Sequence, residues 1–232
     1  MRVADLSVIR GLSLFSSIQE EHFGALIRGA YLQRVPPRLL LIEEGEPADF
    51  LHVIIVGAVE LFARGNRRET TIAIIEPVST FILAAVLKDS VYLMSARTLL
   101  VSRILLIPSE NVRAMMQLDA GFAAAMVREF ATRYRAVVKD LKHQKLRTAV
   151  ERLANYLLRE NLKQGASGDL TLPMEKRMLA SLLGMTPENL SRAFATLKPY
   201  GVEVDGGDIR LARIKELTAL AKPSPLIDDP DS

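Results

Sequence analysis

The spacing of apolar residues changes along the chain and divides it into regions. Residues 1–30 read as short helices. From residue 30 to residue 108, short apolar or alternating runs such as LHVIIVGAVELFA and SARTLLVSRILLIP are separated by Gly, Pro and Asn. Runs of this length, rich in Val, Ile and Leu, are typical of antiparallel strands in a sandwich or barrel. Within this region, residues 63–69 (ARGNRRE) are expected to form a hairpin tip.

One long apolar stripe follows the strands. Ser109 is expected to cap a short helix, and Asp119 a longer one of roughly 25 residues. The stripe can pack against the strands, but over this length it is better explained by pairing with a second copy of itself, which predicts a dimer. Its residues recur at steps of three and four, and they are Phe122, Met126, Phe130, Tyr134, Val137 and Leu141, with Val127 and Val138 widening the stripe.

A second helical pattern breaks at Gly184, within LLGMTPENLSRAFATLK. Ala180 is small enough for another helix to cross closely, and Gly184, four residues later, can take the positive φ that ends a helix. Leu190 lies six residues further on. This spacing is that of a helix-turn-helix, whose second helix enters the DNA major groove. Thr186 suits the N-cap of that helix and Pro187 its first position. Thr186 is also expected among the DNA-binding residues.

Four polar side chains follow the break on the first turns of the second helix. Arg192 can donate to guanine O6 and N7, and Glu188 can accept from cytosine N4. Asn189 and Ser191 can bind phosphate or a base edge. The alternative is an ordinary helical hairpin with solvated charges. Residues 202–212 (VEVDGGDIRLA) look like the hairpin of a wing and favour the DNA-binding interpretation.

Two stretches carry a resemblance to the Crp/Fnr family of bacterial transcription regulators. EEGEPADFLHVIIVGAVELF, with Gly45 and Gly57 at its turns, looks like the family's β-roll core. GMTPENLSRAFATL looks like its recognition helix, in which Glu188, Ser191 and Arg192 would read bases. Pro187 stands where some members carry Arg or Val.

The resemblance implies an α+β fold in which a β-roll of the cyclic-nucleotide-binding type precedes a long dimerisation helix and a C-terminal winged helix-turn-helix. It also implies a homodimer that binds double-stranded DNA at an inverted repeat, with RNA polymerase as a partner. The expected boundaries are a sensor domain at 1–108, the dimerisation helix at 109–142, the DNA-binding domain at 143–221 and a disordered tail at 222–232. The tail is expected from its Pro, Asp and Ser content.

The sensor region departs from the family's cyclic-nucleotide binders. In TFILAAVLKDSVYLMSARTL, Phe81 and Ile82 stand in place of the family's Gly-Glu pair, and Arg97 follows Ala96 instead of preceding it. We therefore expect a small effector other than a cyclic nucleotide, in a mainly apolar pocket. The candidate effector-binding residues are Phe81, Tyr92, Met94 and Arg97.

Composition limits the remaining possibilities. The 232 residues contain no cysteine, which excludes disulfides, thiolate nucleophiles and cysteine-ligated iron–sulfur clusters. Haem is possible, since His22, His52 and His143 are available. No phosphate loop, histidine cluster or nucleophile–base motif is present, so neither an enzyme nor a metal site is expected.

The balance of 30 Lys+Arg against 27 Asp+Glu is mildly basic, which is compatible with nucleic acid. Without a signal peptide or an apolar membrane span in the sequence, we expect a cytoplasmic protein. A ligand-binding interaction module that no longer reads DNA is the alternative function.

Overall fold

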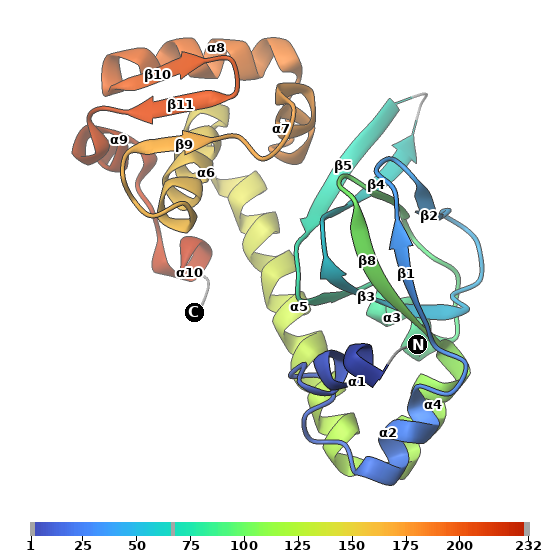
Figure 1. The fold of residues 1–232 in the computed structure, drawn as a ribbon. Coiled ribbons are helices and arrows are strands. Elements are labelled where there is room, and N and C mark those ends of the chain that lie inside the picture. Colours follow the sequence, from blue (N-terminus) through green and yellow to red (C-terminus); the bar gives the residue numbers. More distant parts are fainter. Residues whose placement is uncertain (1–2, 66–67, 230–232) are drawn as a thin grey trace. The chain divides into compact units, whose positions relative to one another are not determined.

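A computed structural model describes residues 3–65 and 68–229 of the chain (Figure 1). It divides into two compact units, residues 1–133 and residues 134–232. Asn66 and Arg67, at the expected hairpin tip, lie outside the described residues.

Unit 1 contains the β-roll, two four-stranded antiparallel sheets in the orders β1-β8-β3-β6 and β2-β7-β4-β5. Strand β3 is buried along nearly its whole length, because it lies between β8 and β6. At the turn that follows it, Gly57 has φ +101°, and a Cβ there would meet the Ser102 hydroxyl at 2.2 Å. The strands are β1 (Tyr31–Val35), β2 (Leu40–Ile42), β3 (Phe50–Val56), β4 (Val59–Gly65), β5 (Arg68–Ile75), β6 (Ser79–Phe81), β7 (Ser95–Thr98) and β8 (Ser102–Pro108).

Four short helices accompany the roll. The expected cap at Ser109 is wrong: helix α4 begins at Ser109, and the Ser109 hydroxyl instead donates to the carbonyl oxygen of Ala48. Each helix contributes apolar residues to the core of the roll, among them Ile9, Leu26, Val86 and Val112. The helices are α1 (Val3–Arg10), α2 (Glu20–Leu26), α3 (Leu83–Lys88) and α4 (Ser109–Leu118).

Helix α5 (Ala120–Leu146) is 27 residues long, and the boundary between the units falls inside it. Asp119 caps it as expected, accepting from Phe122 N at 2.8 Å and, through its other oxygen, from Gln19 N at 3.0 Å. These two N–H groups, with the nearby His22 ring, lower the pKa of Asp119 to about 2.

The apolar stripe on α5 divides into two parts. Phe122 and Met126 are fully buried in the core of unit 1, where the Phe122 ring stacks on Phe15. For these two residues, packing against the strands is the correct interpretation. The remaining residues are exposed, at 37–64%, and they are Val127, Phe130, Tyr134, Val137, Val138 and Leu141.

Unit 2 has its own core, to which leucines of α6, α7, α8 and α9 contribute, and a small sheet in the order β10-β11-β9. Thr148 and Glu151 form a capping box that starts α6, each accepting a bond from the other's backbone N–H. The remaining elements are α6 (Ala149–Lys163), β9 (Asp169–Thr171), α7 (Lys176–Leu182), α8 (Pro187–Leu197), the 3-10 turn η1 (Lys198–Tyr200), β10 (Val202–Asp205), β11 (Asp208–Leu211), α9 (Ile214–Ala221) and α10 (Pro225–Asp228).

The expectation of a disordered tail is wrong for its described part, residues 222–229. A short helix, α10, forms there because Ile227 is buried and Asp228 makes a buried ion pair with Arg147. Residues 230–232 lie outside the described part of the chain.

His52 is a buried titratable group in the core of unit 1. Its ring lies 5.1 Å from that of Phe81 and 6.4 Å from that of Tyr92, measured between centroids. Its Nδ1–H donates to the carbonyl of Phe50. Burial lowers the pKa of His52 to about 4, and the bond to Phe50 only partly offsets this effect. His52 is therefore neutral at physiological pH.

We predict that acid destabilises unit 1 through His52. His52 takes up a proton near the ordinary pKa of 6.5 in the unfolded chain and only near 4 in the folded one. Protonation therefore favours the unfolded chain between these values, and the free energy of unfolding is highest above pH 6.5 and falls as the pH approaches 4. Between pH 7 and pH 4.5 the loss should be about 2–3 kcal/mol. Amide exchange of β3 and β8 at several pH values measures it. His52→Gln should flatten this dependence, whereas His143→Gln in unit 2 should leave it in place. An unchanged slope in His52→Gln would contradict the assignment.

Candidate functional site

The helix-turn-helix forms where the sequence predicts it. Helix α7 ends at Leu182, and Gly184 takes a φ of +62°. The chain reverses through two backbone bonds, from Gly184 N to Ser181 O and from Met185 N to Ala180 O, each 2.9 Å long. Ala180 is fully buried. The break at Gly184 therefore ends α7 and directs the chain into α8.

Close packing adds a second reason for glycine at position 184. A Cβ at this residue would lie 2.4 Å from the Gln144 side-chain oxygen, at the end of α5. The Gln144 amide also donates to Leu182 O at 3.3 Å. Any other residue at position 184 would be strained and would also displace Gln144.

Arg152, on α6, binds the same turn. Its guanidinium donates to the carbonyl oxygens of Leu183 at 2.8 Å and Gly184 at 3.4 Å. It also donates to the carbonyls of Gln144 at 3.4 Å and Arg147 at 2.9 Å, where α5 ends. One side chain thus satisfies carbonyl groups at two helix ends. Sequence reasoning missed Arg152, because an arginine within a helix gives no sign of partners about thirty residues away.

The second helix, α8, begins at the predicted cap. The Thr186 hydroxyl accepts from Asn189 N at 3.2 Å, and Pro187 occupies the first turn. Thr186 therefore has a structural task at the helix start, in addition to any contact with DNA.

Helix α8 has one buried face and one exposed face. Leu190, Ala193, Phe194 and Leu197 are buried in the core of unit 2. The structure brings the sequence-predicted residues together on the first turns of the exposed face, and these are Thr186, Glu188, Asn189, Ser191 and Arg192.

The exposed face offers both donors and acceptors. Arg192 Nη2 donates to the Asn189 side-chain oxygen at 2.7 Å, and the Ser191 hydroxyl donates to Pro187 O. A hydrogen bond from the Thr186 hydroxyl lowers the pKa of Glu188, which therefore carries its charge at neutral pH. All these groups are exposed, so a partner molecule can replace their bonds at little cost.

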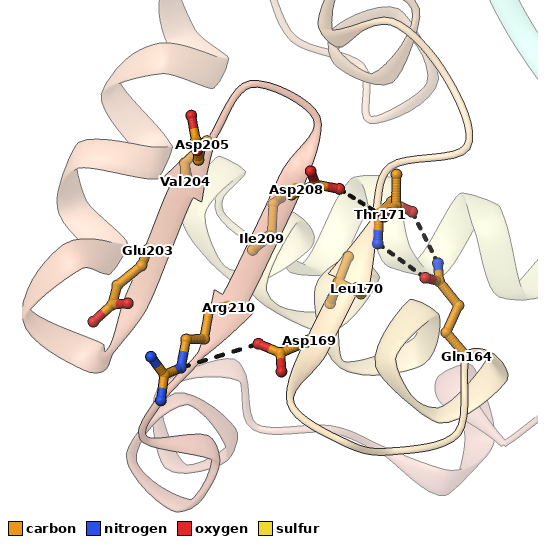
Figure 2. Close-up of a pocket in the computed structure, with 10 residues that line it drawn as sticks. All are labelled: Gln164, Asp169, Leu170, Thr171, Glu203, Val204, Asp205, Asp208, Ile209 and Arg210. Atoms are coloured by element: carbon orange, nitrogen blue, oxygen red, sulfur yellow. Dashed lines mark hydrogen bonds and ion pairs between the residues drawn. The ribbon is translucent and has the colours of Figure 1, made fainter.

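The predicted wing is present as the β10–β11 hairpin, to which β9 adds a third strand. A pocket of about 470 Å³ opens on this sheet. Figure 2 shows Thr171 held on both sides there, its hydroxyl donating to Asp208 at 2.7 Å and its backbone exchanging two bonds with Gln164. The lining is acidic, because Asp169, Glu203, Asp205 and Asp208 are accompanied by a single basic residue, Arg210. The wing thus adds negative charge beside α8.

The four predicted effector-binding residues lie in two environments of unit 1. Phe81 and Tyr92 are buried around His52, and the Tyr92 hydroxyl donates to Phe50 O at 3.3 Å. Burial raises the pKa of Tyr92. Met94 packs against the same apolar core.

Arg97 makes its polar contacts within an ion-pair network. Its Nε lies 2.6 Å from Glu60 and its Nη1 lies 2.9 Å from Glu69, while its guanidinium carbon sits 4.3 Å above the Phe62 ring. Glu60 is only 2% exposed and also accepts from the Thr71 hydroxyl. Burial lowers the pKa of Arg97, but the two carboxylates outweigh it and raise that pKa above its usual value.

Two further properties concern the described residues alone. They contain no group of three or more His, Cys, Asp or Glu side chains that could hold a metal ion. Each helix in them is too short or too polar to cross a membrane.

Comparisons with known proteins match a domain family in each unit. Residues 32–119 match the family model of the cyclic nucleotide-binding domain, and residues 151–221 match that of the Crp-like helix-turn-helix domain. A CRP-like cAMP-activated global transcriptional regulator of Mycobacterium tuberculosis is 21% identical, over 93% of this chain and 99% of that protein.

Solved structures give the same result. A regulatory protein of Silicibacter pomeroyi DSS-3, described provisionally as cAMP-binding, is 28% identical with a TM-score of 0.59, over 96% of this chain and all of that one. FixK2 of Bradyrhizobium japonicum is 22% identical with a TM-score of 0.71, over 84% of this chain and 98% of its own.

The expected α+β fold is confirmed: an N-terminal domain of the cyclic nucleotide-binding type, a long helix and a C-terminal helix-turn-helix follow one another in the family's order. With both domains matched and a relative aligned over nearly its full length, the chain belongs to the Crp/Fnr family, and it is a DNA-binding transcription regulator with an effector-binding domain.

Proposed function

We propose that the protein is a dimeric, sequence-specific regulator that reads an inverted repeat through α8, under the control of a small effector other than a cyclic nucleotide. The main support for DNA reading is the polar face of α8. Its exposed residues are Glu188, Asn189, Ser191 and Arg192, and the other face of the helix is buried. In this proposal, residues 1–108 sense the effector, 109–142 dimerise and 143–221 bind DNA. RNA polymerase is the expected protein partner.

Dimerisation is supported by the exposed part of the α5 stripe. Phe130 is 44% exposed, and Tyr134 and Val137 are 64% exposed. These side chains recur at helical spacing, so they present one apolar seam to water. Pairing with a second copy removes that seam from water and contributes about 25 cal/mol for each Å² of apolar surface buried.

An effector without a phosphate is supported by the state of the charges in unit 1. A cyclic nucleotide needs a guanidinium and backbone donors for its phosphate, since a buried unpaired anion is costly. The Arg97 guanidinium is already bonded to Glu60 and Glu69. An anion bound there would have to displace both carboxylates. The cAMP in the name of the M. tuberculosis relative belongs to a protein only 21% identical.

Haem is poorly supported by the three histidines. His22 Nδ1 bonds Asp119, His52 Nδ1 bonds Phe50 O, and His143 Nδ1 bonds Arg147. His52 and His143 are also buried. Iron would bind Nε2, which these Nδ1 contacts leave available, so it is packing that counts against haem: His52 is enclosed by the Phe81 and Tyr92 rings, and His143 Nε2 is buried.

The acidic wing favours the alternative of an interaction module that does not read DNA, since its carboxylates would be repelled by phosphates. Glu188 and Arg192, exposed together at the start of α8, favour base reading. Binding to DNA decides between the two.

We predict that Arg192→Ala costs about 1–3 kcal/mol of specific binding, because one bidentate contact with guanine is lost in each half-site. Titrations with a selected operator and with random DNA measure the effect. Lys215→Ala removes the same charge outside α8 and should not change the preference for the operator. Equal losses on both DNAs in Arg192→Ala would argue against base reading.

We predict that Phe130→Asp weakens dimerisation and operator binding together. A carboxylate in the apolar seam would have to be buried without a partner, and two copies would place like charges close together. Sedimentation and gel shift measure the two effects. Leu118→Asp, an exposed position on α4, serves as the control. A monomeric wild type that binds a single half-site tightly would refute the dimer.

We predict that cyclic AMP and cyclic GMP bind negligibly, because Phe81, Leu83 and Val86 are buried and Arg97 is committed to internal ion pairs. Isothermal calorimetry with each nucleotide measures this. A stoichiometric titration with a dissociation constant of about a micromolar, or some 8 kcal/mol, would show that the region binds the phosphate after all.

A further inference from the structure

Helix α5 is joined to the DNA-binding domain through two residues, Arg147 and Thr148, which lie between Leu146 and Ala149. The Arg147 side chain points inward and is only 6% exposed. A buried guanidinium is costly unless a carboxylate and further hydrogen bonds compensate it. Whether the Arg147 side chain stays buried at this junction therefore depends on its partner.

That partner is Asp228, 81 residues later in the sequence. Arg147 Nη1 lies 2.7 Å from Asp228 Oδ1 and Nη2 lies 2.5 Å from Oδ2, which is a bidentate pair. The Asp228 side chain is 11% exposed. Arg147 Nη1 also donates to His143 Nδ1 at 2.8 Å, one turn earlier on α5. The pair thus joins the end of α5 to the end of the chain.

Further contacts hold the C-terminal segment, residues 222–229, against the same helices. Lys139 on α5 donates to Asp229 O at 2.6 Å, and Lys222 Nζ lies 3.8 Å from Glu151 Oε1 on α6. Just before the segment, Asn155 on α6 donates to Ala221 O at 2.7 Å. Ser224 N donates to Asp228 Oδ2, which fixes the carboxylate within α10. The segment therefore contacts α5, the junction and α6 together.

Charge makes the junction sensitive to Asp228. Arg152 and Arg159 are the other charged groups acting on His143, which stays neutral because burial and these cations lower its pKa to about 4. Without Asp228, Arg147 would be a buried cation among cations. It would leave the interior for water, and the contacts between α5 and the segment would open.

We propose that the C-terminal segment is a clasp, and that Arg147 and Asp228 are positioning residues that fix the direction in which the DNA-binding domain leaves α5. The turn before α8 is bonded to Gln144 and Arg152 at the same junction. A closed clasp therefore fixes α8 relative to the end of α5. This inference rests on the proposed dimer: there, the clasp sets the distance between the two recognition helices and hence the half-site spacing that is accepted.

The test uses the full-length protein and an operator selected from random DNA, together with operators whose half-sites are one base pair closer or further apart and a duplex with one half-site. Asp228→Asn keeps the shape of the side chain and removes its charge. It should reduce the spacing preference by about tenfold, a typical coupling between sites. Affinity for the single half-site should stay within about twofold, because α8 itself is unchanged. Amide exchange of residues 144–149 should become faster.

Two variants serve as controls. Asp228→Glu keeps the charge and should restore most of the preference, whereas Leu226→Ala, at an exposed position of the same segment, should have no effect. If Asp228→Asn fails to fold, Arg147→Lys decides, since it keeps the charge but loses the bidentate geometry.

An unchanged spacing preference with unchanged amide exchange would overturn the clasp. If the wild type binds no operator, the proposed function fails, and amide exchange alone then decides whether the clasp exists.

Discussion

Carbonyl groups at helix ends have no partner within their own helix, and in unit 2 the Arg152 guanidinium supplies donors for several of them. It binds the last carbonyls of α5 and those of the turn between α7 and α8. Burial lowers the pKa of Arg152, and carbonyl dipoles at the two helix ends face its guanidinium. Arg152 and Gln144 bond the turn that starts α8, and the buried face of α8 packs into the core of unit 2, so these contacts together set the orientation of α8.

The Arg97 network of unit 1 and the exposed face of α8 in unit 2 use charged residues in opposite ways. In unit 1 the charges satisfy one another inside the sheet, as in the network of Glu60, Glu69 and Arg97. In unit 2 the charges at the start of α8 are exposed and make only weak local bonds. The Arg97 network is therefore closed to a new partner, whereas the start of α8 can exchange its local bonds for bonds to another molecule.

Local chemistry explains what could be predicted from the sequence. The glycine at 184, the cap at Thr186 and the buried positions of α8 follow from φ, capping and helical periodicity, all within about twenty residues. The same holds for α5 and its cap at Asp119. What could not be predicted depends on distant partners: Ser109 bonds Ala48, Arg152 bonds Leu183, and Asp228 bonds Arg147. Composition alone suggested disorder for residues 222–229, but the contact between Asp228 and Arg147 orders this segment.

The division of α8 into a buried and an exposed face has an evolutionary consequence. Leu190, Ala193, Phe194 and Leu197 hold the helix in place, and Thr186 starts it, so these five positions tolerate little change. The side chains of Glu188, Asn189, Ser191 and Arg192 are exposed and make only local bonds on the first turns of the helix. On the proposed function, substitutions at these four positions after a gene duplication redirect one copy to new promoters with almost no loss of folding stability.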